Sequence, residues 1–248
     1  MNNFMISFII TFIAGISTLI GGLVPFFNIN NKEKVILLSL AFAAGIMISI
    51  SIFDLLPESF SFLLNDYSLI NIIFIILLSF FIGIFVFVIL DKLLARDVDN
   101  LYRVGIFAMI AIIIHNIPEG IITFILATSD VRLGLLMGVS IALHNIPEGI
   151  SVMIPIYYGT GSFKKSFLFT LVAGLAEPLG GIVFYFLFKN YINNFILGIL
   201  FAFIAGVMIY LSFSELLPKS LYYNKHRSTL FAFMVGIIFF LIIGIFIH

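Results

Sequence analysis

The sequence predicts an all-α polytopic membrane protein with eight transmembrane helices. Apolar residues make up 62% of the 248 residues and charged residues only 10%, and the mean hydropathy is +1.27. Soluble domains are far less apolar, and about a quarter of their residues are charged. Polar clusters divide the chain into eight apolar runs, each near the length of about 20 residues that crosses a bilayer.

These spans must be helical, because a backbone in hydrocarbon has to satisfy its own hydrogen bonds. The connecting segments are too short for a soluble catalytic domain, so residues 1–248 are interpreted as a single transmembrane domain. The first run begins at Phe4 without a basic segment before it, which favours a first span over a cleaved signal peptide. The predicted spans are residues 4–27, 35–57, 69–90, 104–128, 133–158, 165–188, 194–218 and 229–247.

The distribution of Lys and Arg predicts the orientation of these spans. The first, third, fifth and seventh connecting segments contain ten of the twelve basic residues, and the opposite segments contain only Arg132 and Lys189. Basic residues accumulate on the cytoplasmic side of membrane proteins. Both the N- and C-termini are therefore predicted to lie outside the cytoplasm.

The chain also contains an internal repeat. Residues 41–59 (AFAAGIMISISIFDLLPES) and 202–220 (AFIAGVMIYLSFSELLPKS) are identical at 11 of 19 positions, and residues 11–27 and 170–186 share 7 of 17. Repeat 1 (4–91) thus matches repeat 2 (165–247), on either side of a central helix pair (104–158). Each span of repeat 1 matches the span five places later in the chain. Because five is an odd number, matching spans cross the membrane in opposite directions. Inverted repeats are typical of secondary transporters.

The hexapeptide His-Asn-Ile-Pro-Glu-Gly occurs twice, at residues 115–120 and 144–149, in runs that otherwise lack charge. Ionisable side chains in hydrocarbon cost roughly 3 kcal/mol each, so they are rare there without a function. The separation of 29 residues equals about one crossing and a turn, which places both copies at a similar depth. Pro118 and Pro147 cannot donate a backbone hydrogen bond, which predicts a kink in each span.

The spacing within each copy predicts a cation site. His115 and Glu119 lie one turn apart on one helical face, with Asn116 beside them. The second copy repeats this pattern with the residues His144, Asn145 and Glu148. The alternative, in which these groups only join two helices, explains a single copy better than two matched copies.

Glu177 is a third acid inside an apolar span, in the segment Leu-Ala-Glu-Pro-Leu-Gly-Gly. Its counterpart in repeat 1 is Thr18, so the acid breaks the repeat symmetry. Three buried carboxylates without a basic partner cannot all remain ionised unless a cation neutralises them. A protonated Glu177, hydrogen-bonded within its own span, is the alternative. The chain has no Cys, so any metal must bind N and O donors, which suit Zn²⁺, Fe²⁺ or Mn²⁺.

Other residues are candidates for contacts along a cation path. Asp54 and Glu58 end the second span, and Glu215 ends the seventh. They are interpreted either as cation stations on opposite sides or as ordinary polar helix ends. Met47 and Met208 occupy matching repeat positions, and Met in an apolar helix is usually a filler rather than a ligand.

With these features the chain resembles the ZIP (Zrt-/Irt-like) family of divalent metal transporters, of the bacterial ZupT type. The resemblance covers nearly the whole chain and rests on the eight spans, both hexapeptides, Glu-x-x-Gly-Gly in the sixth span, and FAAGIM with Leu-Leu-Pro in the second. It implies a 3+2+3 helix arrangement, homodimers and one bundle moving against the other.

The resemblance also implies a binuclear metal site in which Glu119 and Glu148 contact both ions. The implied ligands of one sub-site are His115, Glu119, His144 and Glu148. Those of the other are Asn116, Glu119, Asn145, Glu148 and Glu177. Many eukaryotic members have a long His-rich loop after the third span, but residues 91–103 contain no His, so metal sensing by this loop is not expected.

These observations predict a transporter rather than an enzyme. We expect uptake of divalent metal ions, zinc above all and also iron, manganese and cobalt, into the cytoplasm across a bacterial plasma membrane. The expected partners are these ions, the lipid bilayer and a second copy of the chain, with no nucleic acid and no separate cofactor. The alternative is an intramembrane metal-dependent hydrolase with the same ligands and an open position for water. The lack of His-Glu-x-x-His and the inverted repeats count against it.

Overall fold

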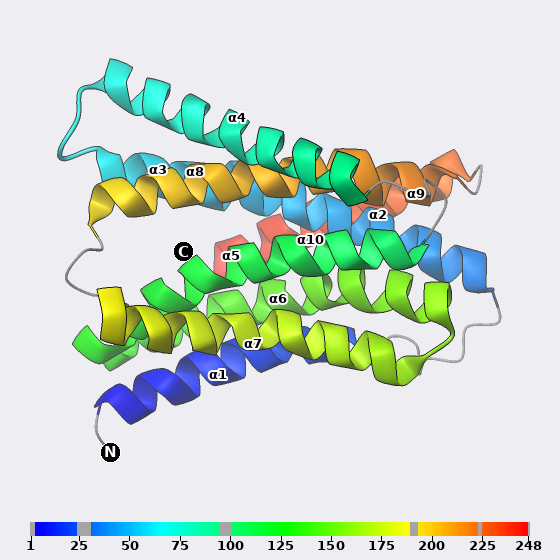
Figure 1. The fold of residues 1–248 in the computed structure, drawn as a ribbon, viewed down its shortest axis with the longest axis horizontal. Helices are drawn as coiled ribbons and strands as arrows, with labels where there is room; N and C mark the ends of the chain where they lie inside the picture. The colour runs from blue at the N-terminus through cyan, green and yellow to red at the C-terminus, as the bar shows by residue number, and fades with distance from the viewer. Residues whose placement is uncertain (1–2, 24–30, 95–100, 189–192, 223–224, 248) are drawn as a thin grey trace.

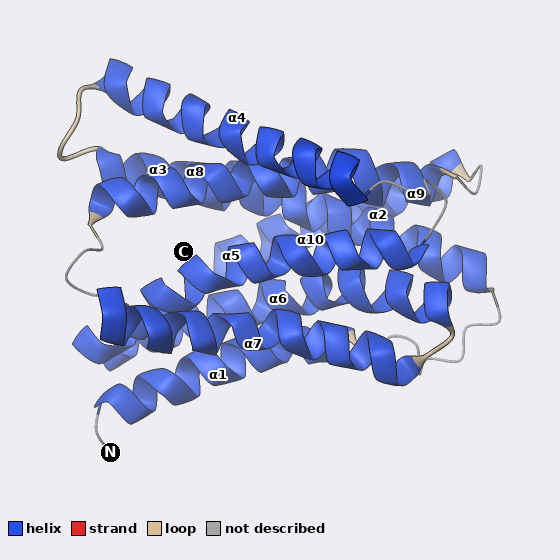
Figure 2. Cartoon of the chain, in the orientation of Figure 1, coloured by secondary structure: helices blue, strands red, loops and turns tan. Residues whose placement is uncertain are grey.

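The computed structural model describes residues 3–23, 31–94, 101–188, 193–222 and 225–247, and in these ranges helices are joined by short turns and loops, without a strand (Figure 2). The side chain of His144 and those of a few other helical residues lie outside the description. The elements are α1 (Asn3–Gly21), α2 (Lys32–Ile50), the π-helical turn η2 (Ser51–Leu55), α3 (Leu56–Leu63), α4 (Leu69–Leu94), α5 (Leu101–Ser129), α6 (Val131–Thr160), α7 (Phe163–Phe188), α8 (Asn194–Leu211), the π-helical turn η3 (Ser212–Leu216), α9 (Leu217–Leu221) and α10 (His226–Ile247).

The predicted spans are confirmed as helices, and most of these helices extend a few residues beyond the predicted bounds. Seven helical units of the described chain are long and apolar enough to cross a membrane, and α10 contributes a shorter described apolar stretch, residues 226–242. The second and seventh spans extend past their predicted ends, to Leu63 and Leu221, through the π-helical turns. The predicted first span reached residue 27, but its last residues, 24–27, lie outside the described part.

The helices pack as two groups of four spans. Helices α1, α5, α6 and α7 contact one another, and α2 packs on α10 while α4 and α3 pack on α8. Figure 1 shows α4, α3 and α8 above α5, α7 and α1. Spans that are distant in sequence, the first and the fourth to sixth, thus form one packing unit. The start of α1 and the end of α10 lie toward the same end of the molecule.

Glycines at matching repeat positions make close helix crossings. A Cβ atom at any of four glycines would overlap a backbone carbonyl oxygen of the partner helix, so only glycine allows this approach. The crossings pair Gly45 with Phe233, Gly236 with Phe42, Gly206 with Phe80, and Gly83 with Phe203. The α2–α10 and α4–α8 contacts are therefore built in the same way.

A π-helical turn interrupts each of the two spans that carry the Leu-Leu-Pro segment. The amide of Leu56 bonds to the carbonyl of Ser51, and that of Leu217 to the carbonyl of Ser212, both five residues back. The following residues, Pro57 and Pro218, have no N–H to donate. Such π-bulges often mark functional positions, and here they contain the acids Asp54 and Glu215.

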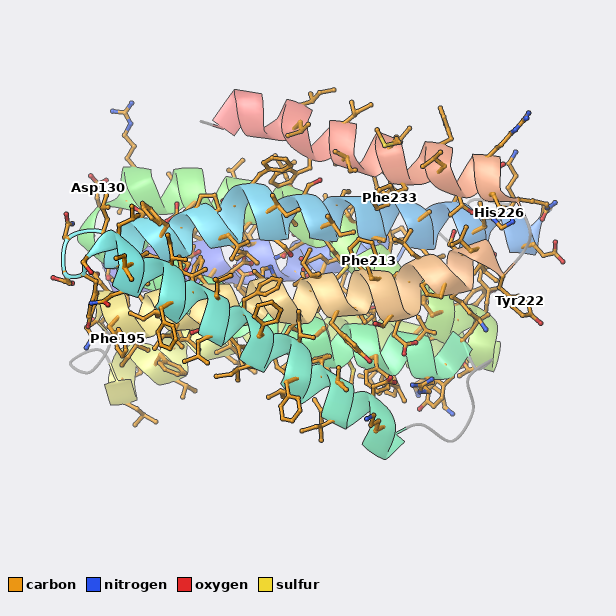
Figure 3. All side chains as sticks on the ribbon, turned by 90° about the horizontal axis from the view of Figure 1, so that it is seen from above. Asp130, Phe195, Phe213, Tyr222, His226 and Phe233 are labelled. Atoms are coloured by element: carbon orange, nitrogen blue, oxygen red, sulfur yellow. The ribbon has the colours of Figure 1, made fainter. Side chains whose placement is uncertain are left out.

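Large apolar side chains face outward over much of the surface. Ile70 is 80% exposed and Phe231 70% exposed, and Figure 3 shows side chains that project from α4 and α10. In a soluble protein an apolar surface of this extent would be a liability. In a bilayer it is the surface that contacts lipid.

Candidate metal site

Three helices bring the predicted site residues together. His115, Asn116 and Glu119 lie on α5, Asn145 and Glu148 on α6, and Glu177 on α7. Gly120 on α5 packs on the backbone carbonyl of Glu177 on α7, and Gly149 on α6 packs on that of Thr18 on α1, so each of these helix pairs approaches closely. In both hexapeptides the final glycine therefore provides a helix crossing directly beside the motif glutamate. Both helices continue through their motif proline, Pro118 or Pro147.

His115 contacts both motif glutamates. Its Nε2 atom lies 3.2 Å from Oε1 of Glu119, on the same helical face, and 3.4 Å from Oε1 of Glu148, on the neighbouring helix. His115 and Glu148 are fully buried, and Glu119 is only 5% exposed. The predicted one-turn spacing is thus confirmed for the first hexapeptide, and the two hexapeptides face each other.

The two motif asparagines each bond to a neighbouring helix at matching repeat positions. Asn116 donates a hydrogen bond of 3.1 Å to the carbonyl of Ala173 on α7. Asn145 donates one of 2.9 Å to the carbonyl of Ala14 on α1, and a second, of 2.8 Å, to Oε2 of Glu177. The amide groups thus join helices, as the simpler interpretation of these residues requires.

The two asparagines and Glu177 also have side-chain oxygen atoms that form no hydrogen bond with the described residues. Oδ1 of Asn116, Oδ1 of Asn145 and Oε1 of Glu177 are buried and have no hydrogen-bond partner among the described residues. A buried acceptor left unsatisfied costs about 1–3 kcal/mol. In both asparagines the NH₂ group fixes the side chain against a neighbouring helix and leaves the oxygen without a hydrogen-bond partner in the described part of the chain. Glu177 is not bonded only within its own span, because Asn145 of α6 is its partner.

The described side chains do not by themselves form a complete metal cage. No group of three His, Asp or Glu side chains within the described ranges is arranged to hold one metal ion. The predicted ligand His144 lies on α6, but its side chain is outside the described part. Among the described basic residues, Arg103 pairs with Asp91 and Glu215, and Lys225 pairs with Glu33.

The candidate path residues have different surroundings. Met47 and Met208 are buried in the apolar core cluster. Asp54 and Glu58 are half-buried in η2 and α3, whereas Glu215 in η3 is 7% exposed. The sequence interpretation missed that Arg103 approaches Glu215. The available signal was an arginine placed twelve residues before the histidine of each hexapeptide, Arg103 and Arg132.

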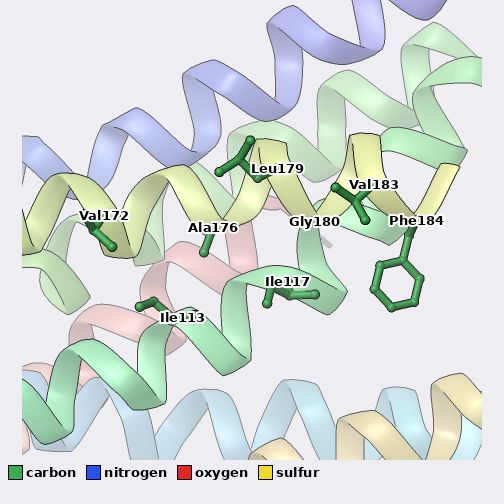
Figure 4. Close-up of a pocket in the computed structure, with 8 residues that line it drawn as sticks. All are labelled: Ile113, Ile117, Val172, Ala176, Leu179, Gly180, Val183 and Phe184. Atoms are coloured by element: carbon green, nitrogen blue, oxygen red, sulfur yellow. The ribbon is translucent and has the colours of Figure 1, made fainter. Parts of the chain in front are cut away.

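An apolar pocket of about 340 Å³ lies between α5 and α7, on another face from the polar residues. Figure 4 shows Ile113 and Ile117 on one wall, with Ala176 and Gly180 on the other. These residues alternate along the helices with His115, Asn116 and Glu177. Because its lining is apolar, this pocket offers no ligand for a cation and is separate from the candidate metal site.

Comparison with known proteins gives one consistent result. Residues 96–244, which include both hexapeptides and Glu177, match the family described as ZIP zinc transporter. A protein named zinc transporter ZupT from Streptococcus mutans is 39% identical, with 91% of each chain covered. Proteins of the same name from Clostridium perfringens and Campylobacter jejuni are 36% and 38% identical, with 91–93% of each chain covered. With this similarity along nearly its full length, the chain belongs to the ZIP family of zinc transporters.

Proposed function

We propose that this protein carries divalent metal ions, zinc first among them, across a membrane into the cytoplasm. The observation that carries the proposal is the meeting of three buried acids from three helices beside a buried imidazole. Glu119 and Glu148 flank His115, and Glu177 lies against Asn145. The names of the related proteins support zinc as the substrate. A carrier of this kind needs no catalytic step, and we propose no enzyme activity.

The donor atoms of the site suit a divalent metal ion of borderline hardness, such as zinc. Imidazole nitrogen and carboxylate oxygen are ordinary zinc ligands, and the absence of Cys excludes a thiolate site. The nitrogen of His115 lies close to two carboxylates, so the three groups converge on a small volume. A divalent ion would neutralise the two carboxylates, so binding offsets the cost of their burial.

We propose two adjacent sub-sites that share the motif glutamates. The first is rich in nitrogen and consists of His115, Glu119, His144 and Glu148. The second offers oxygen donors only, from Asn116, Glu119, Asn145, Glu148 and Glu177. The buried and unpaired oxygens of Asn116, Asn145 and Glu177 support the second sub-site. Iron, manganese and cobalt are proposed as further substrates because oxygen donors suit harder ions.

The transport cycle is proposed to use the inverted repeats, in the 3+2+3 order of spans. The matched glycine crossings and the matched π-helical turns support equivalent repeats. Exchange of the two repeat conformations would open the site first to one side and then to the other. The excess of Lys and Arg in alternate loops supports an orientation with both termini outside, in the plasma membrane of a bacterium such as those that contain the related proteins.

The test is zinc uptake by the purified protein in proteoliposomes. Glu148→Gln keeps the size of the side chain and removes the charge, and Glu119→Gln does the same on α5. We expect each variant to lose nearly all uptake, because each glutamate serves both proposed sub-sites. The matched control is Glu33→Gln, which removes an acid whose side chain is 62% exposed and paired with Lys225. Near-normal uptake by Glu148→Gln would contradict the shared-carboxylate site.

A further inference from the structure

A partly buried ion cluster joins the two helix groups at one end of the molecule. Arg103, at the start of α5, pairs with Asp91 of α4, and its Nη2 atom lies 3.4 Å from Oε1 of Glu215 in η3. Tyr210 of α8 donates a hydrogen bond of 2.9 Å to Asp91, and the guanidinium group lies over the ring of Phe107, 5.2 Å from its centroid. A cation of one group is thus held by acids of the other.

This cluster resists separation of the groups because it is shielded from solvent. The side chains of Arg103 and Glu215 are only 13% and 8% exposed. Breaking such a pair is costly when it leaves a buried charge without compensation. The cluster is separate from the candidate metal site, whose ligands lie further along α5, α6 and α7. Its position instead favours a role in holding one end of the protein closed.

The sequence repeats the arginine, a nearby glycine and the acid of the π-helical turn at the opposite end of the molecule. Arg103 and Gly105 precede His115 by twelve and ten residues, and Arg132 and Gly134 precede His144 by the same intervals. The repeat counterpart of Glu215 is Asp54, and each acid lies in a π-helical turn. Figure 1 shows α3, which follows Asp54, and α9, which follows Glu215, at opposite ends of the molecule.

The two ends of the molecule differ in the structure although their residues match in the sequence. Arg132 is exposed at the start of α6, and its guanidinium has no acidic partner among the residues that the structure describes. Asp54 is half-buried, whereas Glu215 is buried. One arginine is therefore engaged while its counterpart is not. In a protein with inverted repeats, such a difference distinguishes one conformation from its mirror state.

We propose that Arg103 and Arg132 are alternating latches of the two conformations. In this structure Arg103 binds Asp91 and Glu215 and closes the end at α9. In the opposite conformation that cluster separates, and Arg132 binds Asp54 and closes the end at α3. The proposal rests on the alternating access of the proposed function, since it requires two exchanging states. Residues 79–87 (SFFIGIFVF) align with residues 232–240 (AFMVGIIFF), and the same alignment places Gly244 opposite Asp91. The Arg132 latch therefore has one acid fewer and is the weaker of the two.

The test uses single cysteines as reporters in this Cys-free chain. Ser212→Cys reports on the end at η3, and Ser51→Cys reports on the end at η2. The rate of reaction with a small thiol reagent is measured in nanodiscs without metal. We expect Arg103→Gln to raise the rate at position 212 several-fold and to lower it at position 51. Arg132→Gln should shift both rates less and in the opposite directions. Arg227→Gln, at an exposed arginine of α10, is the matched control and should change neither.

The decisive variant exchanges the charges of Arg132 and Asp54, which form no ion pair with each other in this structure. Arg132→Glu with Asp54→Arg should restore the rates that either single change disturbs. Failure of this rescue, or an equal rise at both reporters in Arg103→Gln, would overturn the latch. Zinc uptake by the parent protein is measured in parallel and tests the proposed function separately. Normal uptake with no rescue would reject the latch alone, and labelling that follows the latch pattern without uptake would reject the transport function alone.

Discussion

Asn145 donates a 2.8 Å hydrogen bond to Glu177 across the interface between α6 and α7. Its counterpart on α5, Asn116, bonds to the backbone of Ala173, and the residue that matches Glu177 in repeat 1 is Thr18. The hydroxyl of Thr18 is buried without a hydrogen-bond partner in the described structure. The pseudo-symmetric site is therefore unequal, with one extra carboxylate on the side of α7. This inequality predicts that the two sides prefer different ions.

Replacement of the extra carboxylate tests this preference. Glu177→Ala should reduce iron and manganese uptake more than zinc uptake, because only the oxygen sub-site loses a donor and oxygen donors favour harder ions. Uptake of the three metals is measured in the same proteoliposomes at matched protein content. An equal loss for all three metals would show that the sub-sites cannot be separated in this way.

Removal of the His115 imidazole should change the metal selectivity in the opposite direction. His115→Gln replaces a nitrogen ligand with an amide of similar reach, and imidazole is a preferred zinc ligand. We expect zinc uptake to fall more than manganese uptake, which is the reverse of the Glu177 result. Competition between the two metals in a single uptake assay gives the ratio directly. An unchanged ratio would exclude His115 from the nitrogen-rich sub-site.

The glycine of the second hexapeptide should be needed for packing rather than for metal binding. A Cβ atom at Gly149 would overlap the carbonyl oxygen of Thr18 on α1. Overpacking of this kind typically costs about 1–3 kcal/mol, so Gly149→Val should lower the thermal unfolding midpoint in detergent. The control is Gly161→Asn, because Gly161 has φ +68° and open space around it, and Asn tolerates this conformation. Equal midpoints for the two variants would contradict the close crossing.

The sequence predicted the helices and much of the site because the relevant signals are local. Continuous apolar runs identify spans regardless of what they pack against, and the one-turn spacing places His115 and Glu119 on one face before any fold is known. The spacing of the two hexapeptides along the sequence also predicts that they face each other. The contact of His115 with Glu148 confirms this prediction. Periodicity cannot show which side of a helix faces which neighbour in an apolar chain, so the grouping of the first span with the fourth to sixth was not predicted.

Other features depended on backbone geometry or on distant contacts. The π-helical turns arise where the Leu-Leu-Pro segments change the hydrogen-bond register, and an unaligned sequence predicts only helices there. The count of basic residues that predicts orientation treats Arg103 as a loop residue, yet it lies half-buried at the start of α5, beside Asp91 and Glu215. The asparagines were predicted as cation ligands, but their bonds to Ala14 and Ala173 depend on helix neighbours that no local pattern reveals.

Zinc itself should shift the exposure of the two π-helical turns. Ser51 and Ser212 are buried, and each donates a hydrogen bond of 2.8 Å to a methionine carbonyl one turn back. In sealed vesicles, a small thiol reagent should label Ser51→Cys from the outside and Ser212→Cys from the inside. Because a ligand shifts the populations of two states that it binds unequally, added zinc should change both labelling rates. The same change should be absent when Glu148→Gln is combined with either reporter, since this variant is expected to lose the site. Labelling of both positions from one side only, at rates indifferent to zinc, would indicate a fixed site without a transport cycle.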